Sequence, residues 1–222
     1  MVFVIKPEHK NNTGIQHNVG DTLSKPDDLL ATRRRKQIIS AASLCFSQTG
    51  FHSTSMADII EECGLSAGQI YRHYSGKEII VNESIRYITE LWCAFLLNKL
   101  PEETKTDDII DINSAFWDKW PEDQRRLLIE TYSEASRNDT VRQIVNRAEQ
   151  KLFAGLDEKF SISMPEISQQ ARHQKILLLI LLTDGVICRR FTDNSLNINE
   201  IKRINNIFSH QLHARTNDCQ SD

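Results

Sequence analysis

Apolar residues along this chain recur mainly at intervals of three and four positions, which is the spacing of one face of an α-helix. Ile38, Ala42, Cys45 and Phe46 form such a stripe before Gly50, which can end the first helix. No stretch alternates apolar and polar residues over the length of a strand. The pattern therefore predicts an all-α protein. Later helices are expected at about residues 78–100, 124–137, 141–160, 168–191 and 197–212.

Residues 54–77 predict two short helices joined by a tight turn. Thr54 or Ser55 can cap the first helix, and the pair Ser55 and Asp58 has the spacing of a capping box. Gly64 stands where a helix end favours a residue that tolerates positive φ, and Ser66 can cap the next helix. The run Ser75-Gly76-Lys77-Glu78 predicts a further capping box at the start of a long helix. This order is that of a helix-turn-helix.

The second short helix has side chains suited to duplex DNA. Ile70 and Tyr74 lie four residues apart and are expected to anchor the helix to the core. Gly68 is unfavourable inside a helix unless another surface must approach it closely, and we expect DNA to do so. Predicted base contacts are Ala67, Gln69 and Arg72. Predicted phosphate contacts are Arg33, Arg35, Thr54, Ser66, Tyr71, His73 and Lys77.

Residues 34–81 resemble the DNA-binding domain of TetR-family (tetracycline-repressor-like) regulators. The matching positions are Arg34, Ile38, Ala42, Phe46, Gly50, Phe51, Thr54, Ile59, Cys63, Gly64, Leu65, Ser66, Gly68, Ile70, Tyr71, His73, Tyr74 and Lys77. Ile60 and Cys63 stand where the family usually has alanine, and both changes fall on the buried face. The resemblance implies an N-terminal three-helix helix-turn-helix domain and a C-terminal helical bundle for ligand binding and dimerisation. It also implies a regulator of transcription, more often a repressor, that a small molecule releases from its operator.

Charge and composition divide the chain into four expected regions. These are a flexible arm at 1–30, the helix-turn-helix domain at 31–78, the ligand-binding and dimerisation domain at 79–214, and a tail at 215–222. Residues 30–80 carry a net charge of +2, against −1 before them and −4 after them, within a total of −3. The basic run Arg33 to Lys36 is expected at the N-terminus of the first helix, where phosphate would relieve its conflict with the helix dipole. Residues 101–111 are expected to be an acidic, mobile connection.

Two long apolar surfaces predict a homodimer. The helix at 168–191 is apolar on more than one face, so that the bundle can cover only one side of it. The resemblance implies that this helix and the last one pair with their symmetry mates. The predicted interface consists of Leu178, Leu182, Gly185, Ile201, Ile204 and Phe208. A two-fold dimer would read two half-sites about one turn of DNA, roughly 34 Å, apart.

The effector site is less determined by sequence. Candidate pocket walls are Trp92, Phe95, Phe116, Trp117, Trp120, Tyr132 and Phe153, all of which can equally be ordinary core residues. Glu90, Glu130 and Glu134 can face a cationic ligand or simply face solvent. We expect an apolar, aromatic or cationic small molecule.

Other classes of protein are less favoured. No nucleophile elbow, phosphate-binding loop or metal-ligand spacing is present, so neither catalysis nor a metal or cofactor is expected. A helical interaction module with a degenerate helix-turn-helix is the main alternative. The five dispersed cysteines, without a C-x-x-C pair, fit a reducing cytoplasm, although redox sensing stays open. The longest aliphatic run is too short for a membrane span, and a soluble cytoplasmic protein is expected.

Overall fold

The computed structural model describes residues 26–100, 106–111, 113–189, 199, 200, 203 and 206. Within these residues the chain forms helices and no strand, as the hydrophobic pattern predicts. The helices are α1 (Pro26–Ser53), α2 (Met56–Cys63), α3 (Ala67–Tyr71), α4 (Lys77–Lys99), α5 (Thr106–Ile110), α6 (Glu122–Ala135), α7 (Asp139–Ser163) and α8 (Gln169–Arg189).

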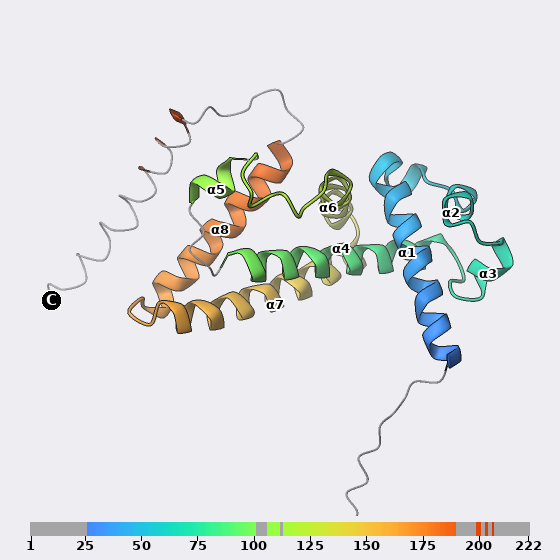
Figure 1. Cartoon of the computed structure of the whole chain (residues 1–222), viewed down its shortest axis with the longest axis horizontal. Coiled ribbons are helices and arrows are strands. Elements are labelled where there is room, and N and C mark those ends of the chain that lie inside the picture. Colours follow the sequence, from blue (N-terminus) through green and yellow to red (C-terminus); the bar gives the residue numbers. More distant parts are fainter. Residues whose placement is uncertain are drawn as a thin grey trace, which may run out of the picture.

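Helices α1, α2 and α3 form a small head at one end of the molecule (Figure 1). The predicted apolar stripe of α1 lies inside it, since Ile38, Ala42 and Phe46 are almost completely buried. Phe46 packs edge-on against Phe51, with their ring centroids 5.1 Å apart. Ile70 of α3 has no exposed surface, so the second helix of the motif is fixed to this core.

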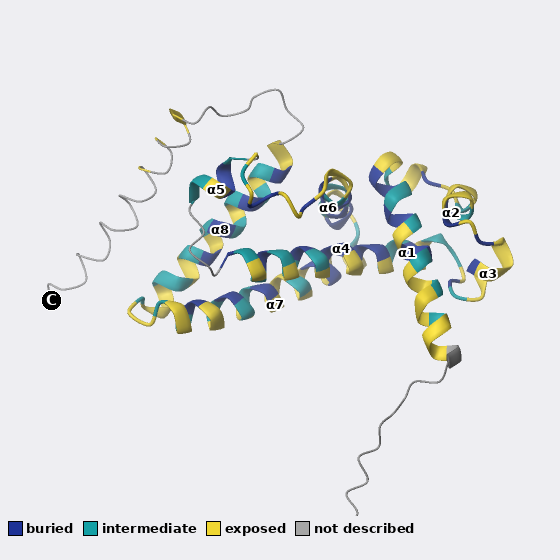
Figure 2. Cartoon of the chain, viewed as in Figure 1, coloured by how far each residue is buried: buried dark blue, intermediate teal, exposed yellow. Residues whose placement is uncertain are grey.

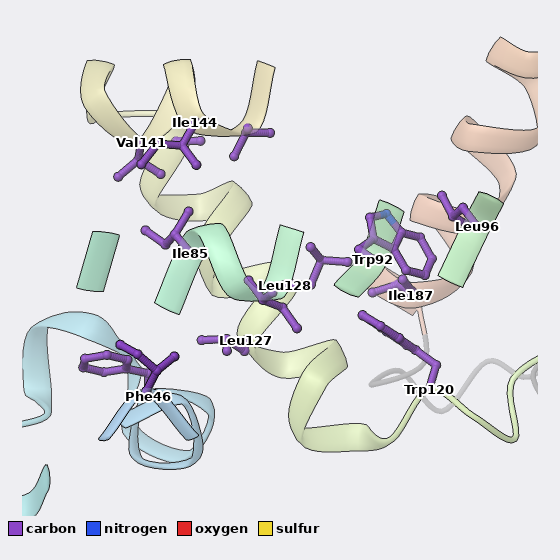
Figure 3. Packing of buried hydrophobic residues seen from close by; sticks show 14 of the residues in the cluster. Phe46, Ile85, Trp92, Leu96, Trp120, Leu127, Leu128, Val141, Ile144 and Ile187 are labelled. Carbon is purple, nitrogen blue, oxygen red and sulfur yellow. The ribbon is translucent and has the colours of Figure 1, made fainter. Parts of the chain in front are cut away.

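Helix α4 leaves the head and becomes part of the C-terminal bundle (Figure 1). It lies beside α7, while α6 packs against α1, α4 and α7, and α8 packs against α5, α6 and α7. The buried faces of α4, α6 and α7 turn toward one another, and their outer faces are exposed (Figure 2). Figure 3 shows how the core continues from Phe46 in the head through Leu127 and Leu128 of α6 to Trp92. One apolar core therefore joins the head to the bundle.

Three local predictions are wrong. Helix α1 begins at Pro26, so the basic run that starts at Arg33 lies about two turns inside the helix, where the dipole no longer acts strongly. The N-cap of α4 is Gly76, and no side chain caps this helix. Residues 106–110 of the expected mobile connection form α5, because Ile109 and Ile110 are buried.

Several predictions lie outside the described residues. They concern most of the N-terminal arm, the interface residues Ile201, Ile204 and Phe208, and the tail at 215–222. Among the described helices, none is long and apolar enough to cross a membrane.

Candidate nucleic-acid interface

The corner between α2 and α3 is built by local hydrogen bonds that the sequence predicts. The backbone N–H of Ser55 donates to the Asp58 carboxylate at 2.7 Å, and the Asp58 N–H donates to the Ser55 hydroxyl at 3.2 Å. Gly64 ends α2 in the left-handed region with φ of 66°. Ser66 then caps α3 through a second capping box with Gln69. These contacts fix the direction in which α3 leaves the turn.

Helix α3 presents one buried and one exposed face. Ile70 and Tyr74 are buried, whereas Ala67, Gly68, Gln69, Tyr71 and Arg72 are exposed and His73 is half-buried. A side chain built at Gly68 would meet no atom of the protein within 4 Å. The fold itself therefore does not require glycine there. The bare backbone of Gly68 faces outward, where a second molecule can approach it closely.

The capping box limits what Gln69 can do. Its Oε1 accepts hydrogen bonds from the Ser66 backbone N–H at 2.9 Å and from the Ser66 hydroxyl at 3.1 Å. Reading adenine with both atoms of the amide would break this cap, whereas the amide nitrogen can donate without doing so. Arg72 is exposed at the end of α3. Of the three predicted base contacts, Arg72 is the longest side chain, and it is less constrained than Gln69.

Thr54 and Lys77 serve the internal structure of the head. Thr54 is 1% exposed, and its hydroxyl donates to the Gly50 carbonyl at 2.8 Å. The Lys77 ammonium donates to the carbonyls of His52 at 3.0 Å and Thr54 at 2.7 Å. We therefore remove Thr54 from the proposed phosphate contacts. Lys77 keeps at most one N–H for phosphate, because an ammonium has three donors.

The basic residues of α1 differ in their surroundings. Arg33 and Arg35 are exposed, but two positions on a helix diverge by about 200°, so the two side chains leave opposite sides of α1. Arg34 donates to Gln37 at 2.8 Å, and Gln37 donates to the Cys63 carbonyl at 3.0 Å. Arg34 therefore helps to tie α1 to the end of α2.

The head is held to the bundle by two glutamates of α6. The Phe51 backbone N–H donates to Oε1 of Glu130 at 2.9 Å. Oε2 of Glu134 lies 3.2 Å from Nε2 of His52. Burial disfavours the Glu134 carboxylate, but hydrogen bonds from Asn138, Arg137 and His52 outweigh it and lower its pKa. An open cleft of about 450 Å³ lies between α1 and α6 beside Glu130.

Gly50 allows this close junction. Its φ of 80° lies in the left-handed region, and a Cβ there would approach Oε1 of Glu130 to 3.1 Å. Glu130 and Glu134 thus couple the two parts of the molecule, contrary to the expectation that they can face a ligand. Glu90, the third glutamate in that expectation, is exposed.

The predicted aromatic residues mostly form one cluster inside the bundle. Trp92 contacts Phe95, Trp117 and Trp120, with centroids 5.5, 6.4 and 4.9 Å away. Phe116 joins through Phe95 and Trp117, and the Trp92 indole N–H donates to the Tyr132 hydroxyl oxygen. Phe153 lies apart from these rings and packs on His173 at 4.6 Å. Much of the expected pocket wall is therefore packed against itself.

Sequence reasoning missed two carboxylates beside this cluster. Asp184 of α8 is half-buried, and burial together with the charge of Glu149 raises its pKa to about 7. Glu149 of α7 is exposed, and partial burial raises its pKa too. The signal for Asp184 was its position as a single acid in the apolar middle of a long helix.

The exposed face of α8 differs in detail from the predicted interface. Leu178 and Leu182 are half-buried, whereas Leu177 is 44% and Leu181 69% exposed. Gly185 is exposed, and a Cβ there would meet nothing within 4 Å. Leu177, Leu181 and Gly185 are spaced by four residues and therefore share one face.

The described cysteines are poor candidates for redox sensing. Burial raises the pKa of Cys45, Cys63 and Cys188, and it raises that of Cys93 to about 11. A raised pKa keeps these thiols protonated near neutral pH, and the thiolate is the reactive form.

Known proteins match both the head and the overall fold. The sequence profile of the bacterial regulatory proteins of the tetR family matches residues 38–83. The HTH-type transcriptional regulator UidR of Escherichia coli K12 is 32% identical over 112 residues, which are 48% of this chain and 54% of UidR. The chain thus spans about half the length of this curated relative.

Two solved structures share the fold. Salmonella enterica GusR superposes with a TM-score of 0.62 at 23% identity, covering 87% of this chain and all of GusR. A transcriptional regulator from Saccharomonospora viridis, solved in complex with choline, has a TM-score of 0.60 at 17% identity and covers 80% of this chain and 95% of its own. The head matches the tetR family of bacterial regulatory proteins over residues 38–83, and the described chain shares the fold of the two solved structures.

Proposed function

We propose that this protein is a sequence-specific DNA-binding regulator of transcription that acts as a homodimer, and that it is a repressor released by a small molecule. The observation that carries the proposal is the exposed face of α3. This five-residue helix is anchored by Ile70, and it turns Gln69, Tyr71 and Arg72 away from the protein beside the bare backbone of Gly68. A helix presented in this way fits the major groove of DNA.

The proposed contacts follow from exposure. Arg72 and the amide nitrogen of Gln69 read base edges, and Ala67 contacts a thymine methyl group. Tyr71, His73, Ser66 and one of Arg33 and Arg35 bind phosphate. Lys77 contributes mainly by holding the segment before α2 in place.

Dimerisation is proposed through α8, with Leu177 and Leu181 as central residues beside Leu178, Leu182 and Gly185. Exposed leucines on one helical face favour burial against a second copy, and Gly185 permits a close approach. Two-fold symmetry would place two copies of α3 on successive half-sites of a palindromic operator.

Helix α6 is the proposed route from effector to DNA. Tyr132 reaches the aromatic cluster, and Glu130 and Glu134 on the same helix hold the end of α1. A ligand that binds more tightly to one position of α6 would favour one orientation of the heads. If that orientation does not fit DNA, the ligand weakens DNA binding by the difference in its affinity for the two states. The choline complex of the Saccharomonospora viridis protein supports a small-molecule effector for this fold.

Fluorescence anisotropy with the DNA upstream of the protein's own gene, against a scrambled duplex, tests the proposal. We expect tight, selective binding with a steep dependence on salt. Equal and weak binding to both duplexes, followed by failure to enrich any sequence from a random pool, would instead support the interaction module without DNA binding.

A further inference from the structure

The half-buried carboxylate of Asp184 has no cation beside it among the described residues. Its Oδ1 is inaccessible to solvent and has no hydrogen-bond partner among the described residues. Burial and, after it, the charge of Glu149 raise its pKa, and no basic side chain of the described residues acts on it. An unpaired carboxylate in such surroundings is unfavourable unless something compensates for its charge.

Aromatic side chains from two other helices stand beside this carboxylate. Burial and, after it, the charges of Asp184 and Glu149 raise the pKa of the Tyr132 phenol on α6. Trp92 of α4 hydrogen-bonds that phenol and packs against Trp120. Figure 3 shows Ile187, which lies one helical turn after Asp184, beside the rings of Trp92 and Trp120. Helices α4, α6, α7 and α8 thus bring one polar and aromatic group of side chains together.

A second polar group of the aromatic cluster also has no partner among the described residues. Trp120 is 2% exposed, and its indole N–H donates to no acceptor among the described residues. Buried indole N–H groups usually have a hydrogen-bond partner. The aromatic end of the cluster therefore offers a donor, while Asp184 and Glu149 offer negative charge.

Three basic side chains of the bundle make their contacts elsewhere. The Arg125 guanidinium lies 5.7 Å from the centroid of Trp117, and its Nη2 donates to the Trp117 carbonyl. The Lys175 ammonium lies 5.5 Å from the centroid of Phe160. Lys151 acts on Cys93, where it lowers a pKa that burial and two glutamates raise. None of these cations is among the groups that act on Asp184.

We propose that Asp184, Glu149, Trp92 and Tyr132 form the effector site, and that the effector is a small organic cation, an amine or quaternary ammonium compound, which also carries a hydrogen-bond acceptor. The inference rests on the proposed ligand-responsive function. The cation offsets the repulsion between the two carboxylates and lies against the aromatic rings. The acceptor group of the ligand accepts a hydrogen bond from the Trp120 indole N–H.

Burial across the site gives the ligand a direction of entry. Trp120 is almost completely buried, Tyr132 and Asp184 are half-buried, and Glu149 is exposed. A cation therefore meets Glu149 first and Asp184 deeper in. Tyr132 is two residues from both Glu130 and Glu134, so that a bound ligand acts directly on the helix that holds the head.

The test is a thermal-shift and calorimetric screen of the full chain against primary amines and quaternary ammonium compounds, each with its uncharged isostere. Choline and 3,3-dimethylbutan-1-ol are such a pair. We expect at least one cation to raise the melting temperature, and its neutral isostere to have no effect. Asp184→Asn should weaken binding of that cation at least tenfold, and Glu149→Gln should weaken it less. Glu158→Gln, on the exposed side of α7, is the matched control and should bind as the wild type does.

A dependence on pH adds a readout that a general loss of structure would not reproduce. The carboxylate of Asp184 becomes protonated below about pH 7, so affinity should fall about tenfold from pH 8 to pH 6. Asp184→Asn should remove most of that dependence. No stabilisation by any cation of the panel, or equal binding by wild type and Asp184→Asn, would overturn the inference.

The inference and the proposed function can fail separately. Selective DNA binding without any response to cations would overturn the effector class alone. If the protein binds a cation but selects no sequence from a random DNA pool, the proposed DNA-binding function alone would be overturned.

Discussion

Replacing Lys77 by methionine separates a structural role from a DNA-binding role. Methionine keeps most of the apolar stem but removes the ammonium that bonds the carbonyls of His52 and Thr54 at 3.0 and 2.7 Å. Hydrogen bonds to charged groups contribute about 1.5–3 kcal/mol each when they are well shielded. Lys77 is only half-buried, and water can replace part of each bond. We therefore expect the free energy of unfolding to fall by about 1–3 kcal/mol in total.

Urea denaturation followed by circular dichroism measures this change, and anisotropy across a salt series measures DNA binding. Arg33→Met is the matched control, because Arg33 is an exposed cation of the same head. It should change the stability by less than about 0.5 kcal/mol. The structural role of Lys77 would be refuted if Lys77→Met kept wild-type stability and only reduced the salt slope by about one, as loss of a phosphate contact does.

Four further predictions concern other parts of the molecule. Tyr71→Phe should weaken binding about equally on operator and random DNA in anisotropy titrations; a loss confined to the operator would contradict its phosphate role. Arg72→Ala should lower the preference for the operator by about 1–3 kcal/mol in the same assay, and an unchanged preference would exclude base reading. Gly50→Ala should destabilise the protein by about 1–2 kcal/mol in urea because of its φ of 80°, and wild-type stability would argue against strain. Asp184→Asn without ligand should be more stable than wild type at pH 8 in thermal melts. The raised pKa of Asp184 makes the wild type lose stability as pH rises from about 4 to 7. If the melting temperatures of wild type and Asp184→Asn changed with pH in the same way, this would be contradicted.

The local pattern of the head could be predicted because short-range interactions determine it. Ser55, Gly64 and Ser66 each act through bonds to residues three or four positions away, and such spacing is visible in a sequence. Ile70 and Tyr74 likewise follow from helical periodicity. Apolar spacing also predicted α4, α6, α7 and α8 to within a few residues.

The site predictions that the structure changes depend on contacts between segments that are distant in the chain. Lys77 bonds carbonyls more than twenty residues before it, and Glu130 reaches Phe51 across 79 residues. Some backbone N–H and carbonyl groups have no partner within their own helix or turn, and a side chain from a distant segment bonds them instead. A sequence pattern alone does not reveal which backbone groups these are. Thr54 was taken for a surface hydroxyl for the same reason. Asp184 could have been found, because a single acid within an apolar helix indicates a buried charge with a role.

Selection of bound sequences from a random DNA pool tests the central claim most directly. The account predicts enrichment of one palindromic sequence, whose half-sites are about one helical turn apart and which binds two chains. Arg72→Ala should relax the selected sequence within each half-site. A pool that stays random after repeated rounds, with binding that depends only on salt, would contradict sequence-specific regulation by this protein.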